Sequence, residues 1–224
     1  MTDPRGSLAA SLPYVAPFAV LLALLAAGPL LPVQADGPFR VVVLAITLWF
    51  FSRRVIRFQA RFVLPSALAG VAVFLVWIAP DQWIPHYRDS WLFQNAVTGT
   101  LHSSIPPRLL VNPAVLAFRV IRSVVLTPLA EELFWRGWLM RWLISQDFER
   151  VPLGSYTPAS FWITAVLFAS EHGPYWDVGL AAGIVYNWWL LRTRSLGDCI
   201  LAHAVTNASL AGYVIATHRW EYWL

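Results

Sequence analysis

The sequence has no lysine, a single cysteine and few charged residues of any kind. Charged residues make up 12% of the chain, against about a quarter in an ordinary water-soluble domain. Hydrophobic residues make up 58%, so the 224-residue composition excludes a water-soluble globule and indicates an integral membrane protein. The lone Cys199 excludes an internal disulfide and every CxxC metal or redox motif, and we expect it to be a buried structural thiol.

Because lysine is absent, all 16 basic residues are arginines, and against 12 acidic residues they leave a net charge of +4. In a chain this apolar, we interpret the surplus as a signal of membrane topology. A nucleic-acid partner is therefore disfavoured, and the expected surroundings are a lipid bilayer. The all-arginine basic set is also typical of a GC-rich bacterial genome, which favours a bacterial inner membrane.

Apolar runs are long enough to predict an all-α polytopic bundle, because a helix crosses the ~30 Å hydrocarbon core in about 20 residues. The second, fifth and sixth runs are short and require extension or burial among other helices. Between the third and fourth runs, residues 81–112 are expected to form an interfacial or re-entrant element, which raises the count to seven to eight membrane helices. With no repeat or linker, residues 1–224 are expected to form one domain. The runs are residues 12–33, 38–51, 62–79, 113–145, 158–171, 178–191 and 196–217.

Two loops are rich in arginine, one after the second run and one after the sixth. With seven crossings both loops fall on the same side of the membrane as the N-terminus, so we predict a cytoplasmic N-terminus. We interpret the first run as a retained helix, because it is long for a cleaved signal peptide. The arginines in these loops are Arg53, Arg54, Arg57, Arg61, Arg192 and Arg194.

Ionisable residues in the fourth run stand where lipid makes them costly, and each therefore requires a partner or a function. Glu132 and Arg136 are four residues apart and can form an ion pair on one helix face. Glu131 is then unpaired on this helix. Since adjacent side chains diverge by about 100°, we expect the two glutamates to occupy different environments. Glu131 is the candidate general base facing a cavity.

The fifth and seventh runs supply imidazoles and an amide. His172 follows the fifth run, and His203 and Asn207 lie one turn apart on the seventh. His172 can hold a water molecule against Glu131, while His203 and Asn207 can donate hydrogen bonds to the oxyanion of a tetrahedral intermediate.

Two other interpretations of these residues stay open. Membrane bundles use Asn, His and Thr as interhelical hydrogen-bond partners, which needs no catalysis. Two histidines and a glutamate are also a known zinc ligand set, although the helical HExxH signature is absent. We expect no metal and no cofactor.

The ordered set Glu131-Glu132-x-x-x-Arg136, Phe168-x-x-x-His172 and His203-x-x-x-Asn207 resembles the CAAX protease and bacteriocin-processing family of intramembrane glutamate endopeptidases. The resemblance covers about residues 115–215 and extends in size and layout to the bacterial subgroup associated with exosortase sorting systems. It implies a catalytic core at about residues 113–217.

The resemblance implies a metal-independent endopeptidase in which Glu131 and His172 activate water and His203 and Asn207 stabilise the oxyanion. Glu132 and Arg136 fall at positions that organise the site. The expected partner is a peptide or protein substrate at or in the membrane. The alternatives are a non-catalytic peptide-binding scaffold, a bacteriocin self-immunity protein, a metallopeptidase and a proton-coupled transporter.

Overall fold

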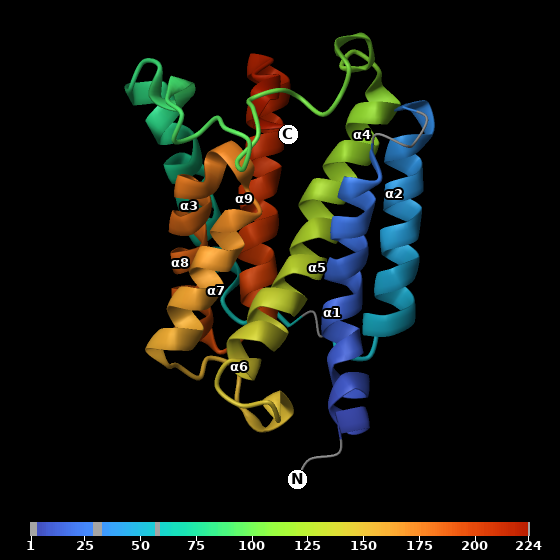
Figure 1. Cartoon of the computed structure of the whole chain (residues 1–224), viewed down its shortest axis with the longest axis vertical. Coiled ribbons are helices and arrows are strands. Elements are labelled where there is room, and N and C mark those ends of the chain that lie inside the picture. Colours follow the sequence, from blue (N-terminus) through green and yellow to red (C-terminus); the bar gives the residue numbers. More distant parts are fainter. Residues whose placement is uncertain (1–3, 29–32, 57–58, 224) are drawn as a thin grey trace.

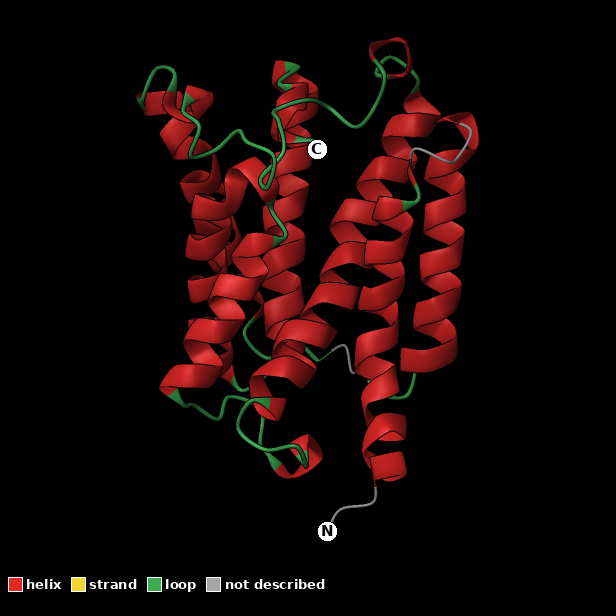
Figure 2. Ribbon diagram, in the orientation of Figure 1, coloured by secondary structure: helices red, strands yellow, loops and turns green. Residues whose placement is uncertain are grey.

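The computed structural model describes residues 4–28, 33–56 and 59–223, and all regular secondary structure in these ranges is helical (Figure 2). The all-α fold predicted from the sequence is therefore confirmed. Each of the seven predicted runs coincides with a helix or with a set of joined helices. The helices are α1 (Pro4–Ala26), α2 (Val33–Thr47), α3 (Val63–Trp83), α4 (Pro113–Ile121), α5 (Thr127–Glu132), α6 (Met140–Trp142), α7 (Pro158–Ser170), α8 (Trp176–Thr193) and α9 (Leu196–Thr217).

Helices α4, α5 and α6 form one long helix, because the π-helical stretches Arg122–Leu126 and Leu133–Leu139 join them without a break. Its start is fixed by Asn112, whose side chain accepts hydrogen bonds from the first backbone amides of α4, and by Pro113 at the first helical position. Isolated π-helical turns are frequent at functional sites, and here two of them flank the glutamate pair of α5.

The number of membrane-crossing helices is slightly lower than predicted. Five helical spans in the described residues are long and apolar enough to cross a membrane. Helix α7 is apolar but has 13 residues, and α8 is not among the five, so the count is five to seven rather than seven to eight. The five are Leu8–Ala26, Ala35–Ser52, Val63–Trp83, Pro113–Trp142 and Leu196–Thr217.

The first two predicted boundaries were wrong. Helix α1 ends at Ala26 rather than at residue 33, and α2 begins at Val33 rather than at Pro38. Pro38, where the second apolar run was predicted to begin, lies inside α2. Residues 29–32, where the first run was expected to end, lie outside the described residues.

Residues 84–112 add no eighth span to the bundle, and their interfacial or re-entrant placement in a membrane stays a prediction. They contain only the short 3₁₀ turns Tyr87–Asp89 and Pro107–Leu109, and they cross the end of the bundle opposite the N-terminus (Figure 1). Polar contacts tie them to the helices. The buried Arg88 forms ion pairs with Asp81 at 2.9 Å and Asp177 at 2.8 Å, and donates a hydrogen bond to the carbonyl of Pro174.

The connections follow the predicted parity. The N-terminus, the α2–α3 connection and the α8–α9 connection lie at one end, and the C-terminus lies at the other (Figure 1). The arginine-rich loops therefore share the N-terminal end, although Arg57 lies outside the described residues. That this end is cytoplasmic stays a prediction.

Close helix packing positions α9, which carries His203 and Asn207. Helix α3 packs along α9, where Gly70 allows contact because a Cβ at this position would overlap the carbonyl oxygen of Ala202. Cys199, on the same helix, is fully buried, and its thiol contacts the carbonyl oxygen of Tyr186 at 3.7 Å. The prediction of a buried structural thiol is therefore confirmed.

Candidate active site

Glu131 lies in the middle of the long helix and faces a cavity of about 240 Å³. Its side chain is buried, yet the Oε2 atom accepts no hydrogen bond from the described residues. The nearest basic atom among its printed ion-pair contacts is Nε2 of His203, at 3.8 Å. A buried carboxylate oxygen without a partner is costly, so this atom is available to a water molecule or a ligand.

His172 lies in the turn between α7 and α8 and lines the same cavity. Its Nδ1 atom is 2.7 Å from the carbonyl oxygen of Phe168. Because a carbonyl can only accept, Nδ1 carries the hydrogen in the neutral ring and Nε2 presents a lone pair. The rings of Trp77 and Phe168 pack against the imidazole and fix its orientation.

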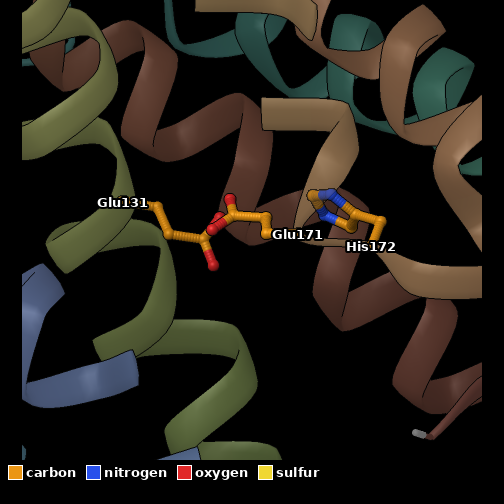
Figure 3. Close-up of side chains that lie close together, drawn as sticks. All are labelled: Glu131, Glu171 and His172. Carbon is orange, nitrogen blue, oxygen red and sulfur yellow. The ribbon is translucent and has the colours of Figure 1, made fainter. Parts of the chain in front are cut away.

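Glu171 is a third ionisable residue at this position, and it was not among the site residues predicted from the sequence. Ligand atoms of Glu131, Glu171 and His172 all lie within 4.8 Å of one another (Figure 3). Two hydrogen bonds of about 2.8 Å through one water span up to about 5.6 Å, so one water molecule can bridge these groups. The indole Nε1 of Trp135 donates a hydrogen bond to Glu171 at 3.0 Å.

Glu132 and Arg136 form the predicted ion pair, which is confirmed at 3.2 Å with both side chains fully buried. The guanidinium also donates hydrogen bonds to Oδ1 of Asn187 at 2.9 Å and to the carbonyl of Gly183 at 3.3 Å. Its carbon lies 4.4 Å from the centre of the Phe168 ring. These contacts anchor the glutamate pair of the long helix to α7 and α8.

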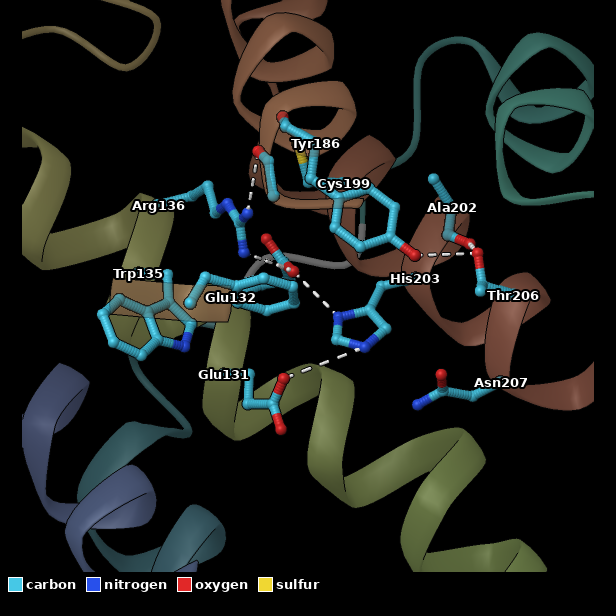
Figure 4. A network of polar contacts seen from close by, with 12 residues as sticks. Glu131, Glu132, Trp135, Arg136, Tyr186, Cys199, Ala202, His203, Thr206 and Asn207 are labelled. Atoms are coloured by element: carbon cyan, nitrogen blue, oxygen red, sulfur yellow. Dashed lines mark hydrogen bonds and ion pairs between the residues drawn. The ribbon is translucent and has the colours of Figure 1, made fainter. Parts of the chain in front are cut away.

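His203 connects the two glutamates. Its Nδ1 atom is 2.8 Å from Oε1 of Glu132, and its Nε2 atom faces Oε2 of Glu131 at 3.8 Å (Figure 4). The two glutamates approach opposite nitrogens of one imidazole, yet they occupy different environments, as expected. They differ in that Glu131 faces the cavity, while Glu132 is enclosed in the ion pair.

A stacked tyrosine holds this imidazole in place. The ring of Tyr186 stacks on His203 with centroids 5.0 Å apart, and its hydroxyl donates to Oγ1 of Thr206 at 2.7 Å. The Thr206 hydroxyl contacts the carbonyl oxygens of Gly70 at 2.9 Å and of Ala202 at 3.1 Å. The α3–α9 contact therefore also fixes the position of His203.

Asn207 lines the same cavity one turn beyond His203. Its side-chain amide donates a hydrogen bond to the carbonyl oxygen of Ser123 at 2.7 Å, where the backbone is π-helical. An amide group has two N–H donors, so one stays available to a bound group. All four predicted catalytic residues thus line one cavity, from three separate parts of the chain.

A divalent metal ion is a chemically reasonable ligand for Glu131, Glu171 and His172, because two carboxylates and an imidazole are ordinary ligands of such ions. This set differs from the one considered from the sequence, since Glu171 replaces the second histidine. His203 instead contacts the two glutamates of α5.

Residues 113–209 match the family described as type II CAAX prenyl endopeptidase Rce1-like. The matched region contains all six predicted site residues and also Glu171. No curated protein matches the chain, and no solved structure does.

Proposed function

Taking residues 113–209 as a region of the CAAX protease family, we propose that the protein is an intramembrane endopeptidase whose water nucleophile is activated by Glu131. The observation that carries this proposal is the convergence of Glu131, Glu171 and His172 within 4.8 Å on a cavity enclosed by apolar helices. Ionisable residues within membrane helices are costly and mark functional sites. Together with the family match, this convergence favours hydrolysis over a purely structural polar network.

The orientation of the acceptors suits one water molecule. Oε2 of Glu131 has no hydrogen-bond partner, and Nε2 of His172 presents a lone pair, so the two atoms can accept both hydrogens of the same water. The lone pairs of the water oxygen then face the cavity. A peptide carbonyl carbon placed there is attacked while Glu131 takes one proton from the water.

The oxyanion formed by this attack needs donors on the far side of the carbonyl. In the proposal, His203 donates from Nε2 in its protonated form, since Nδ1 faces the carboxylate of Glu132. Asn207 donates the N–H that Ser123 does not use. Glu131 then passes its proton to the leaving nitrogen as the C–N bond breaks, which gives a carboxylic acid and an amine.

Glu132 and Arg136 are positioning residues in this scheme. Glu132 holds the Nδ1 side of His203, and Arg136 neutralises the buried carboxylate while linking it to α8. Neither side chain lines the cavity, which agrees with a role in orienting His203.

The same proposal includes a bacterial inner-membrane location with the arginine-rich end in the cytoplasm. The substrate is a peptide or protein segment that reaches the cavity from the lipid phase or from the membrane surface.

Replacing Glu131 tests the base assignment. Glu131→Gln keeps the shape of the side chain but removes its ability to take a proton, so cleavage of a fluorescence-quenched apolar peptide by the protein in lipid nanodiscs should fall at least a hundredfold. Glu149→Gln, in an exposed loop, is the matched control and should leave the rate unchanged.

Persistent cleavage by the Glu131→Gln variant would refute this role. A wild-type protein that binds the peptides but cleaves none would instead indicate the peptide-binding scaffold or self-immunity function.

A metal-dependent mechanism is the second candidate, favoured by the proximity of Glu131, Glu171 and His172. We expect dialysis against a strong chelator to leave the cleavage rate unchanged, because the proposed nucleophile needs only the protein's own base. Loss of activity on chelation and its recovery with Zn²⁺ would show that the three residues bind a metal. Substrate flux without hydrolysis in proteoliposomes would indicate transport.

A further inference from the structure

A row of polar residues continues along the long helix beyond the proposed catalytic residues. Arg119, Arg122, Ser123, Thr127 and Glu131 all line the cavity. Arg119, Ser123, Thr127 and Glu131 follow one another at intervals of four residues, and Arg122 lies three residues after Arg119, so this face of the helix carries the polar row. The face that carries Glu131 therefore also carries arginines, toward the end of the bundle where the helix begins.

Arg122 is a buried cation without a counter-ion in the described part of the chain. Only 8% of its surface is exposed, its Nη1 atom makes no hydrogen bond, and no ion pair with a described residue involves it. The nearby Asp36 is already paired with Arg40 at 2.6 Å, and Arg119 donates to the Ser104 hydroxyl at 3.2 Å. A buried guanidinium with an unused donor is a site for an anion.

A second cavity, of about 590 Å³, adjoins this position. It is lined by Ser104 and Pro106, at the end of the bundle, and by Arg119, Arg122 and Glu171, which also line the catalytic cavity. Arg122 therefore lies between a cavity that reaches the end of the bundle and the cavity that holds Glu131. A ligand that extends from one into the other passes its guanidinium group.

We propose that Arg122 anchors a subsite that binds a carboxylate of the peptide substrate, about four residues from the bond cleaved at Glu131; this inference rests on the proposed function. The nine residues from Arg122 to Glu131 correspond to about 13 Å of helix. An extended peptide covers that distance in about four residues, at 3.3–3.6 Å each. The carboxylate is either the C-terminal group of the substrate or an Asp or Glu side chain.

The position of Arg122 favours a peptide over a lipid headgroup. The residue lies about 13 Å along the helix from its start at Pro113, whereas lipid phosphates lie at the membrane surface. Arg122 also shares its cavity with Glu131, and a planar guanidinium can bind a carboxylate through two parallel hydrogen bonds.

Matched peptide pools test the subsite. Apolar dodecapeptides with a free C-terminal carboxylate, the same peptides amidated, and amidated peptides with Asp at successive positions are incubated with the protein in nanodiscs, and products are identified by mass spectrometry. We expect a carboxylate to raise kcat/KM at least about tenfold over the plain amide. Cleavage should occur three to five residues from that carboxylate. Comparison of the free-terminus and Asp pools identifies which source of carboxylate is used.

Variants of Arg122 then test whether this residue causes the preference for peptides with a carboxylate. Arg122→Gln should bring the carboxylate-to-amide ratio of kcat/KM close to one, and Arg122→Lys, which keeps the charge, should retain part of it. Arg108→Gln removes an exposed arginine at the same end of the bundle and should leave the ratio unchanged. Because the readout is a ratio, a partial loss of folded protein does not change it.

Several outcomes overturn the inference. A wild-type ratio near one for both the free-terminus and Asp pools excludes the subsite, as does an unchanged ratio in Arg122→Gln. Loss of co-purified phosphatidylglycerol in that variant, with the ratio preserved, assigns Arg122 to a lipid. If the wild-type protein cleaves no pool, the proposed function fails. The subsite is then tested by binding of the same pools to Glu131→Gln, where equal affinity for carboxylate and amide overturns it.

Discussion

The buried pair of Glu132 and Arg136 gives the sharpest test of how the site is held together. Both side chains are fully buried, and Oε1 of Glu132 lies 3.2 Å from Arg136 and 2.8 Å from His203. Arg136→Met leaves this carboxylate without its cation, and breaking a buried pair from one side costs about 3–5 kcal/mol. Glu132→Gln leaves the guanidinium without its anion and should have a cost of the same order.

The double variant distinguishes a pair from two independent residues. Glu132→Gln/Arg136→Met removes both charges of the pair and leaves neither member unpaired, so its loss of stability should be smaller than the sum of the single losses by about 2 kcal/mol or more. Reversible unfolding of the detergent-solubilised protein with increasing mole fraction of SDS measures all four species. The exposed pair Arg150–Asp147 provides a control cycle, for which we expect coupling close to zero. Losses for Glu132 and Arg136 that add within about 0.5 kcal/mol would refute the reasoning.

Two further predictions concern the packing around the site. Arg88→Gln removes the ion pairs to Asp81 and Asp177 and the hydrogen bond to Pro174, so the turn that carries His172 should become less rigid. We expect a lower melting temperature and a lower kcat. An unchanged kcat would show that the contacts of Arg88 are not needed to position His172. Gly70→Val should force α3 away from α9 and lower the free energy of unfolding by about 1–3 kcal/mol or more, measured by thermal unfolding. The control is Gly212→Val, because a Cβ at Gly212 meets nothing within 4 Å. Equal losses of stability in the two variants would contradict the packing argument.

The helical architecture could be predicted from the sequence because apolar runs of about 20 residues have few other structures available in lipid. Helix ends were less predictable. The second apolar run was predicted to begin at Pro38, but this proline lies inside α2, which begins at Val33. The path of residues 84–112 was also not specified by the sequence, because the ion pair of Arg88 with Asp177 joins positions that are far apart in the chain.

Within the site, the identity of individual residues was easier to predict from the sequence than the contacts between them. Glu132 and Arg136 follow from a local rule of helix spacing, and their pairing is confirmed. That His203 contacts both glutamates depends on how α9 crosses the long helix, which no local pattern specifies. Glu171 could have been identified by the argument applied to Glu131, since both are acids at or beside an apolar helix.

The part of the chain before residue 113 lies outside the matched family region, yet it forms part of the cavity. Trp77 of α3 packs on His172, and Leu21 of α1 lines the cavity beside Glu131. The chemistry and the shape of the site therefore come from different parts of the sequence. If the proposed function holds, changes at Leu21 or Trp77 should alter which peptides are cleaved, while changes at Glu131 should abolish cleavage of all of them. In this proposal, peptide preference depends on α1 and α3 as well as on the catalytic region.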